Sequence, residues 1–256
     1  MANLFKGDLG YSYRYSAPVS QLIIERLPIT LLLTIAANVI AFGLGVYTGL
    51  ISARRYRSGV DATLSLIAFV LNSMPSFLLG IILMLIFAVH LKVLPVSGMI
   101  DVRNPKTGVM LYIDVLYHAI LPITTLALIL LPSYFKIVRD TALQQLGEDY
   151  VTTFRAVGLD EWKIFKRHIF RNAILPPITL FTIRLGYSVA GAAIIETVFG
   201  WPGIGRLLLA SIRERDYPVI MGIYLMVTTS IVVLSIITDL VYSLLDPRVK
   251  TGGMRT

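Results

Sequence analysis

The sequence contains no cysteine among its 256 residues and only three histidines, at positions 90, 118 and 168. The lack of cysteine excludes a disulfide framework, a thiolate nucleophile and a cysteine-based metal site. The histidines are too scattered along the sequence to suggest a cluster of metal ligands. We therefore predict no metal site in this chain.

Motifs that would make the chain an enzyme or an ATPase are also missing. No G-x-x-x-x-G-K-[ST] loop occurs, and the glycine cluster at 200–205 lacks the lysine and the serine or threonine that hold phosphate and magnesium. No H-E-x-x-H run or nucleophile–base arrangement points to an intramembrane protease. We predict a non-enzymatic chain with no catalytic residue and no cofactor of its own.

Charge is scarce as well, since only 15% of the residues are charged and 56% are hydrophobic. The mean hydropathy of +0.76 lies outside the range usual for soluble domains, which favours a lipid bilayer as the solvent. The net charge of +8 falls largely in short segments between long apolar runs and is not interleaved with aromatic residues on one face. That pattern indicates membrane topology and attraction to anionic lipid, and it argues against nucleic-acid binding.

Five apolar stretches are long enough to cross a bilayer, whose core of about 30 Å needs about 20 helical residues. The expected spans are 27–53, 62–91, 119–138, 173–197 and 219–245. Prolines and glycines inside them are tolerated when neighbouring helices satisfy the freed backbone groups, and Gly45-x-x-x-Gly49 permits close helix contact. The predicted fold is an all-α, polytopic membrane bundle over 27–245.

The loops predict the orientation of this bundle, because basic residues concentrate on the cytoplasmic side. Arg54, Arg55 and Arg57 follow the first span, and many more basic residues occupy the segment 139–172. We expect these loops and the tail 246–256 to be cytoplasmic, which places the segment 1–26 outside. That segment has no apolar stretch of its own, so either the first span inserts as a reverse anchor or another span precedes it.

The segment 139–172 is long for a connection and contains helix-like stretches, which is typical of functional loops. A helix should end near Val157, because Gly158 suits a left-handed C-terminal cap. A second helix should begin near Asp160, whose side chain can cap its first turn. The sequence predicts a short helix-turn-helix that could receive a push from a soluble partner.

This segment resembles the EAA loop of permeases from binding-protein-dependent ABC importers, aligned on Gly158. Residues 152–154 and 168–171 differ from the general E-A-A and I-x-L-P elements. They fit the peptide/nickel subfamily instead, whose R-A-x-G-L and R-H-x-x-R-N-A runs match 155–159 and 167–173. The difference from the general pattern thus refines the assignment.

Further stretches resemble the same subfamily, and the likeness covers nearly the whole chain. The segments at 7–10 and 94–98 are similar to the first of the two permease types that pair in these systems. In that type an N-terminal span precedes the G-D-x-G segment, so we favour an additional upstream span. The other matching stretches are 185–187, 191–192, 196–206, 215–218 and 245–248.

The resemblance implies one permease subunit of an ATP-driven importer in the inner or plasma membrane of the cell, forming half of the translocation pathway for peptides or a related solute such as nickel. Implied partners are a second homologous permease, two ATP-binding subunits that hold ATP and magnesium, an extracytoplasmic solute-binding protein and the lipid bilayer. A coupling helix around 148–159 would dock on the ATP-binding subunit. The docking residues would be Glu148, Asp149, Thr152, Thr153, Arg155, Ala156, Gly158 and Leu159.

Four polar residues are candidates for the pathway or its gate, and each has a structural alternative. Arg184 lies inside a span, where a charge lines a pathway or pairs with a carbonyl or an acid. Glu196 would shape the outer gate or remain a solvated carboxylate at a helix end. Asn72 and Ser73 would face a passing peptide or hydrogen-bond between helices, as would Asn38.

The alternative function is a secondary active transporter or a channel subunit. Such carriers need no ATPase, but they commonly show internal repeats and ionisable residues near the membrane midplane. The sequence shows no repeat and only Arg184 deep within a span. The importer permease is therefore the preferred prediction.

Overall fold

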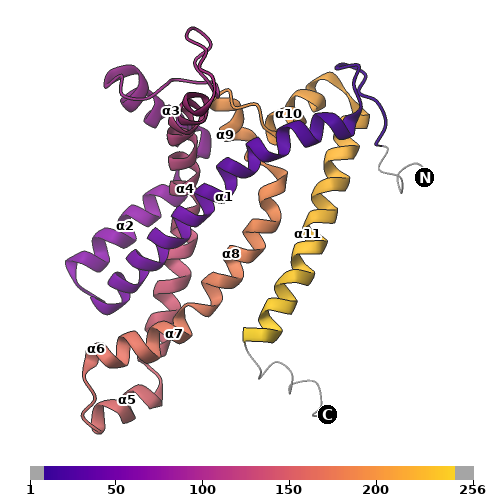
Figure 1. The fold of residues 1–256 in the computed structure, drawn as a ribbon. Coiled ribbons are helices and arrows are strands. Elements are labelled where there is room, and N and C mark those ends of the chain that lie inside the picture. Colours follow the sequence, from indigo (N-terminus) through magenta and orange to yellow (C-terminus); the bar gives the residue numbers. More distant parts are fainter. Residues whose placement is uncertain (1–8, 246–256) are drawn as a thin grey trace, which may run out of the picture. The chain divides into compact units, whose positions relative to one another are not determined.

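The computed structural model describes residues 9–245, and the side chains of 9–236. Most of this range is helical, and the longest connection without helix is 91–108. No β-strand occurs in the described range, which confirms the all-α prediction. The first half of the chain forms α1 (Val19–Arg54), α2 (Gly59–Ser73), α3 (Ser76–Met84), the π-helical η2 (Leu85–His90) and α4 (Val109–Leu146) (Figure 1). The second half forms α5 (Asp149–Ala156), α6 (Glu161–Lys163), the π-helical η3 (Ile164–Ile169), α7 (Phe170–Ala173), α8 (Leu175–Tyr187), the 3₁₀ turn η4 (Ser188–Ala190), α9 (Ala193–Val198), α10 (Ile204–Glu214) and α11 (Tyr217–Leu245).

Four continuous helical runs are long and apolar enough to cross a membrane, and a bent helix pair makes a fifth if it counts as one span. This result agrees with the predicted number, but several bounds differ. Helix α4 has 38 residues and extends well beyond the expected 119–138, because neither flank contains a residue that ends a helix. The predicted tail 246–256 and the motif at 245–248 lie largely outside the described residues.

The second predicted span, 62–91, is wrong as a single straight helix. Helices α2 and α3 meet at an angle of 104° across a short break at Met74 and Pro75. Proline disfavours a helical conformation in the residue before it, and Met74 is extended with φ −80° and ψ 132°. Helix α2 has 15 residues, or about 22 Å, and is too short to cross the bilayer alone.

The fourth predicted span, 173–197, is wrong at both ends. The helical run begins at Glu161 and continues to Ala190. It stops at Gly191, which has a φ of +77° that favours glycine. Helix α9 is therefore a separate element, and Glu196 does not share a helix with Arg184.

The described chain divides into two compact units. One unit consists of residues up to 35 together with those from 182 onward, and its core joins the start of α1 to α10 and α11. The other unit comprises residues 36–181 and contains two apolar clusters. One of these clusters joins α1 to α4, and the other lies around the α5–α6 hairpin.

Candidate functional site

The α5–α6 hairpin is the predicted helix-turn-helix, and its turn has well-defined geometry. Helix α5 ends at Ala156, and Gly158 takes a φ of +82°. The Gly158 N–H donates to the carbonyl of Arg155 and the Leu159 N–H to that of Phe154, both at 3.0 Å. This pair of bonds is a Schellman cap, which satisfies carbonyls left over at a helix end. The predicted break at Gly158 is confirmed.

The second arm of the hairpin is fixed by side chains. The Asp160 carboxylate accepts hydrogen bonds from the backbone N–H groups of Trp162 at 3.0 Å and Lys163 at 3.2 Å. This is the predicted N-cap. Arg155 on α5 forms a two-point ion pair with Glu161 on α6, with Nε–Oε1 at 2.6 Å. The two arms of the turn are therefore cross-linked as well as capped.

The inner side of the hairpin packs into the adjoining helices (Figure 1). Val151 of α5 is fully buried against Ala142 of α4 and Ile164 of η3, which are fully buried too. The apolar cluster extends to Ala53 near the end of α1. A displacement of α5 would therefore press directly on helices that continue into the membrane.

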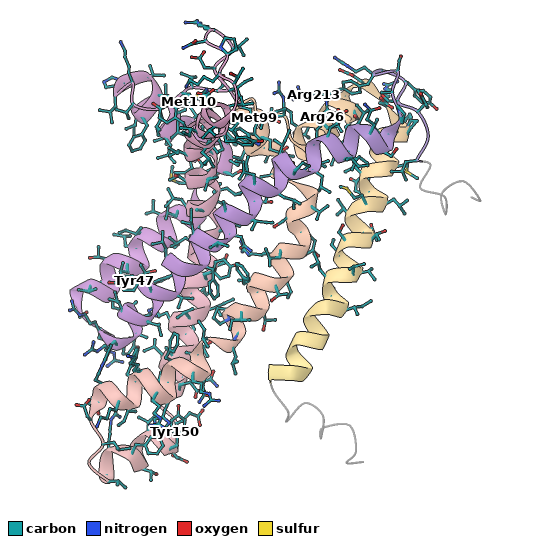
Figure 2. All side chains as sticks on the ribbon, in the orientation of Figure 1. Arg26, Tyr47, Met99, Met110, Tyr150 and Arg213 are labelled. Carbon is teal, nitrogen blue, oxygen red and sulfur yellow. The ribbon has the colours of Figure 1, made fainter. Side chains whose placement is uncertain are left out.

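Polar and aromatic contacts reinforce this packing. The Gln145 side-chain oxygen accepts from the Tyr150 hydroxyl at 2.9 Å and from the Asn172 amide at 3.0 Å, which ties α4 to α5 and α7. The His168 ring lies 4.4 Å from that of Phe154. Figure 2 labels Tyr150, which lies on α5 of the hairpin. The histidine and asparagine of the 167–173 motif thus hold the hairpin in place.

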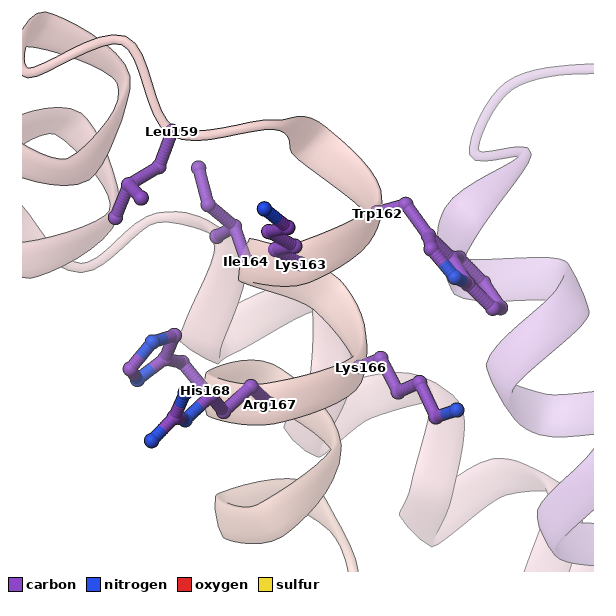
Figure 3. A pocket seen from close by; sticks show the side chains of 7 residues that line it. All are labelled: Leu159, Trp162, Lys163, Ile164, Lys166, Arg167 and His168. Carbon is purple, nitrogen blue, oxygen red and sulfur yellow. The ribbon is translucent and has the colours of Figure 1, made fainter.

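The outer side of the hairpin faces away from the unit. All eight predicted docking residues are exposed, whereas Val151 is buried and Phe154 half-buried. Figure 3 shows neighbouring side chains on η3, among them His168 and Arg167 on the side of Leu159. The exposed set is Glu148, Asp149, Thr152, Thr153, Arg155, Ala156, Gly158 and Leu159.

An ion pair near the hairpin was missed in the sequence. Asp61, at the start of α2, accepts two hydrogen bonds from Arg139 of α4, at 2.8 and 3.1 Å, and one from the Ser52 hydroxyl at 2.5 Å. In the sequence, Arg139 is simply one of the basic residues of the segment 139–172. The available signal was local: Asp61 stands three residues after Ser58, whose side chain caps α2.

Glu196, a predicted gate residue, is fully buried, so the solvated alternative is wrong. One carboxylate oxygen accepts from the Arg206 backbone N–H at 2.8 Å and the other from the Thr30 hydroxyl at 3.0 Å. The Thr30 hydroxyl in turn accepts from the Ile204 N–H at 2.7 Å. Helix α10 follows Gly203, which has no side chain to cap it. Thr30 and Glu196 therefore cap α10 from a distance, and a carboxylate is favoured at this positive helix end.

The remaining gate candidates lie on α8 and α2 and not on α9. Arg184 is half-buried in α8, and its carbonyl accepts from the Ser188 hydroxyl at 3.0 Å. Asn72 and Ser73 are exposed at the end of α2, where the Ser73 hydroxyl bonds the Phe69 carbonyl. Asn38 is buried and accepts from the Tyr134 hydroxyl at 2.6 Å, so it forms the interhelical bond given as its alternative.

The start of the described chain is anchored by Asp216, just before α11. Asp216 accepts from the Ser12 hydroxyl at 2.5 Å and from the backbone N–H groups of Tyr13 and Arg14, both at 3.3 Å. Arg14 also pairs with Glu214. Burial opposes ionisation of Asp216, but the hydrogen bonds from Ser12, Arg14 and Tyr13 outweigh it and hold the pKa of this carboxyl below its usual value.

Replacing Asp216 by asparagine is expected to destabilise the protein by about 1–3 kcal/mol at neutral pH, because the buried Ser12 hydroxyl and two backbone N–H groups lose a charged acceptor. A depressed pKa contributes stability above the unfolded value of about 3.9, and this contribution is lost as the pH falls through the lower folded value. The difference in unfolding free energy between variant and wild type should therefore become smaller in acid. Thermal unfolding at pH 7 and below pH 4 measures both, with exposed Glu25→Gln as the control. A gap that stays constant with pH would contradict the assignment.

The fold and the projecting hairpin define a polytopic helical membrane subunit. Comparison with known proteins identifies its family. A family model described as the inner membrane component of binding-protein-dependent transport systems matches residues 45–251. The dipeptide transport system permease protein DppB of Escherichia coli K12 is 36% identical over 261 residues, covering 95% of this chain and 77% of that protein. The oligopeptide transport system permease protein AppB of Bacillus subtilis 168 is 34% identical, covering 98% and 78%.

Solved structures agree at the level of the fold. A subunit of the inward-facing MetNI methionine ABC transporter superposes with a TM-score of 0.67 at 16% identity, covering 88% of this chain and 97% of that one. A second neighbour, from an amino acid ABC transporter, has a TM-score of 0.56 at 18% identity, covering 90% and 94%. The chain belongs to the family of inner-membrane components of binding-protein-dependent transport systems. This membership confirms the predicted multi-pass membrane location and the non-enzymatic, permease character of the chain.

Proposed function

We propose that the chain forms half of the translocation pathway of an ATP-driven peptide importer and that the α5–α6 hairpin couples it to an ATP-binding subunit. The observation that carries the coupling is the two-sided hairpin. Its outer side exposes the eight docking residues, whereas its inner side is anchored by the buried Val151. The peptide substrate is supported by the relatives that transport dipeptides and oligopeptides. The resemblance to the peptide/nickel subfamily makes a nickel complex a second candidate substrate.

The coupling would work as a lever. Closure of the ATP-binding subunits would move the exposed side of α5, and Val151 and Gln145 would transmit that movement to α4. Rigid elements with two stable arrangements can convert such a movement into alternating access. Arg155 would keep the hairpin rigid during this movement, because its ion pair with Glu161 holds the two arms together.

The full assembly would contain this permease, a second homologous permease, two subunits that bind ATP and magnesium, and an extracytoplasmic solute-binding protein. The hairpin and the C-terminal tail would face the cytoplasm, and the segment 1–26 the outside. Glu196 would support the outer gate by capping α10, and Arg184, Asn72 and Ser73 would contribute polar groups along the pathway. The proposed orientation of the hairpin, the tail and the segment 1–26 rests on the basic residues near the ends of α1 and α4, because such residues concentrate on the cytoplasmic side.

Site-specific photo-crosslinking in native membranes tests the proposal. A photoreactive residue in place of exposed Thr152 is expected to capture a protein with a P-loop ATPase sequence, identified by mass spectrometry. The matched control is Met110, which is 62% exposed near the opposite end of α4 and should not capture it. Purification of the chain without an ATPase, together with ion-gradient-driven uptake in ATP-free vesicles, would instead establish a secondary carrier.

A further inference from the structure

A cleft of about 700 Å³ opens within the unit of residues 36–181, between the end of α1 and the run from α6 to α7. It does not include the exposed side of α5, and it shares Leu50 and Phe165 with the apolar cluster beneath that helix. Three cations, Arg54, Arg55 and Lys166, occupy its polar part. Its apolar lining consists of Tyr47, Leu50, Ile51, Trp162, Phe165 and Phe170.

Along α1 the lining of the cleft changes from charged to apolar, as a bilayer leaflet does from its headgroups to its acyl chains. Arg54 is the last residue of this apolar helix, and Tyr47 lies seven residues earlier, which is about 10 Å at 1.5 Å per residue. The cleft is thus basic where the helix ends and apolar toward its middle. Exposed Tyr47 and Trp162, at 64% and 50%, are residue types enriched at membrane interfaces.

The cations of the cleft form no ion pair with any residue in the described part of the chain. Among the residues that the structure describes, no carboxylate lies within ion-pair distance of Arg54, Arg55 or Lys166. The neighbouring acids are already used, since Asp61 binds Arg139 and Glu161 binds Arg155. Arg54 lies over the Trp162 ring at 4.7 Å, a contact that orients the guanidinium and leaves its charge intact.

We propose that this cleft binds an anionic phospholipid, such as phosphatidylglycerol or cardiolipin. The phosphate would lie between the two arginines and Lys166, and an acyl chain would follow Tyr47, Leu50 and Ile51 along α1. Basic pockets between membrane helices are suited to such headgroups. A soluble phosphate would satisfy the cations but leave the apolar wall without a partner. The site depends on neither the orientation of the chain nor the proposed coupling role of α5.

Two adjacent residues provide a matched pair for the test. Figure 3 shows Lys166 pointing to the same side of η3 as Trp162, whereas Arg167 points to the opposite side. Arg167 does not line this cleft. Lys166→Gln and Arg167→Gln remove the same charge from neighbouring positions, so only the first should affect the lipid.

The experiment uses the transporter purified with its partner subunits in detergent. Native mass spectrometry would count the retained anionic lipids, and thermal unfolding would be titrated with phosphatidylglycerol, phosphatidylcholine and inorganic phosphate. Each cation near a membrane surface is worth about a fivefold change in affinity. We expect Lys166→Gln to weaken phosphatidylglycerol binding about fivefold and Arg55→Gln with Lys166→Gln about 25-fold. Arg167→Gln and phosphatidylcholine should produce no change.

Three results would overturn the proposal. Equal lipid retention in wild type and the double variant would show that the cleft holds no lipid. A stabilisation by inorganic phosphate as large as that by phosphatidylglycerol would assign the cations to a soluble anion. The third result concerns a photoreactive group at Tyr47 in otherwise wild-type protein, a test that does not depend on assembly of the double variant. A lipid adduct is expected there, and capture of a protein would show that the cleft is a subunit interface. Because ATP hydrolysis is not measured, a negative result leaves the α5–α6 coupling proposal unaffected.

Discussion

Gly158→Val is expected to abolish most ATP-driven uptake while the protein still inserts and accumulates in the membrane. Gly158 has a φ of +82°, in the left-handed region that costs other residues about 1–2 kcal/mol and β-branched residues more. That energy corresponds to about a 5- to 30-fold loss in the fraction of hairpins with the native turn. Without the turn, α5 and α6 no longer present the docking side as one rigid surface.

Asparagine at the same position is the matched control, because it tolerates a positive φ better than other residues with a Cβ. A Cβ at Gly158 would meet no atom within 4 Å in this chain, so the expected difference between valine and asparagine comes from the backbone alone. Uptake and ATP hydrolysis in proteoliposomes measure the coupling. Wild-type uptake in the valine variant would contradict the docking assignment. Equal losses in both variants would contradict the backbone explanation.

The hairpin was predictable because its signals are local. Gly158 ends one helix and Asp160 begins the next, and each residue acts within one or two turns of its own position. The spans were predictable from length and hydropathy, which require no knowledge of neighbours. Their bounds were not, because α4 continues past the apolar stretch into residues that are polar but favourable for a helix.

The contacts that position Glu196 could not be read from the sequence. Glu196 and Thr30 are separated by 166 positions, and Asp61 and Arg139 by 78. Both pairs form because helices fold back on one another, and neither partner carries a local pattern that identifies the other. The sequence placed Glu196 at the end of a long span. It lies instead on a separate short helix, because Gly191 interrupts the span, and its carboxylate completes the first turn of α10.

The small-residue pair in α1 shows the same limit. Gly45 and Gly49 permit close helix contact in general, but the sequence does not say which helix approaches. The structure assigns the approach to α4: a Cβ at Gly45 would lie 2.4 Å from the Cβ of Tyr134. At Gly49 the nearest atom would be the backbone oxygen of Phe135, at 2.8 Å. Neither a Cβ nor a carbonyl oxygen can rotate away, so neither glycine can take a side chain unless α1 and α4 move apart.

Gly49→Ala is therefore expected to destabilise the protein by about 1–3 kcal/mol or more, the usual cost of overpacking. Relief would require α1 and α4 to separate, which would disrupt the apolar cluster beneath Tyr134. Thermal unfolding of the detergent-purified protein measures the loss, and reduced accumulation in the membrane should accompany it.

Gly43→Ala, six residues earlier in the same helix, separates this packing effect from the general response of α1 to alanine. Gly43 is exposed, and a Cβ there would meet no atom within 4 Å. Alanine in a helix interior is favoured over glycine by about 0.5–1 kcal/mol, so this variant should be as stable as wild type or slightly more stable. The two substitutions should thus shift the unfolding temperature in opposite directions. Similar shifts in both variants would show that α1 and α4 do not approach as closely at Gly49 as the structure indicates.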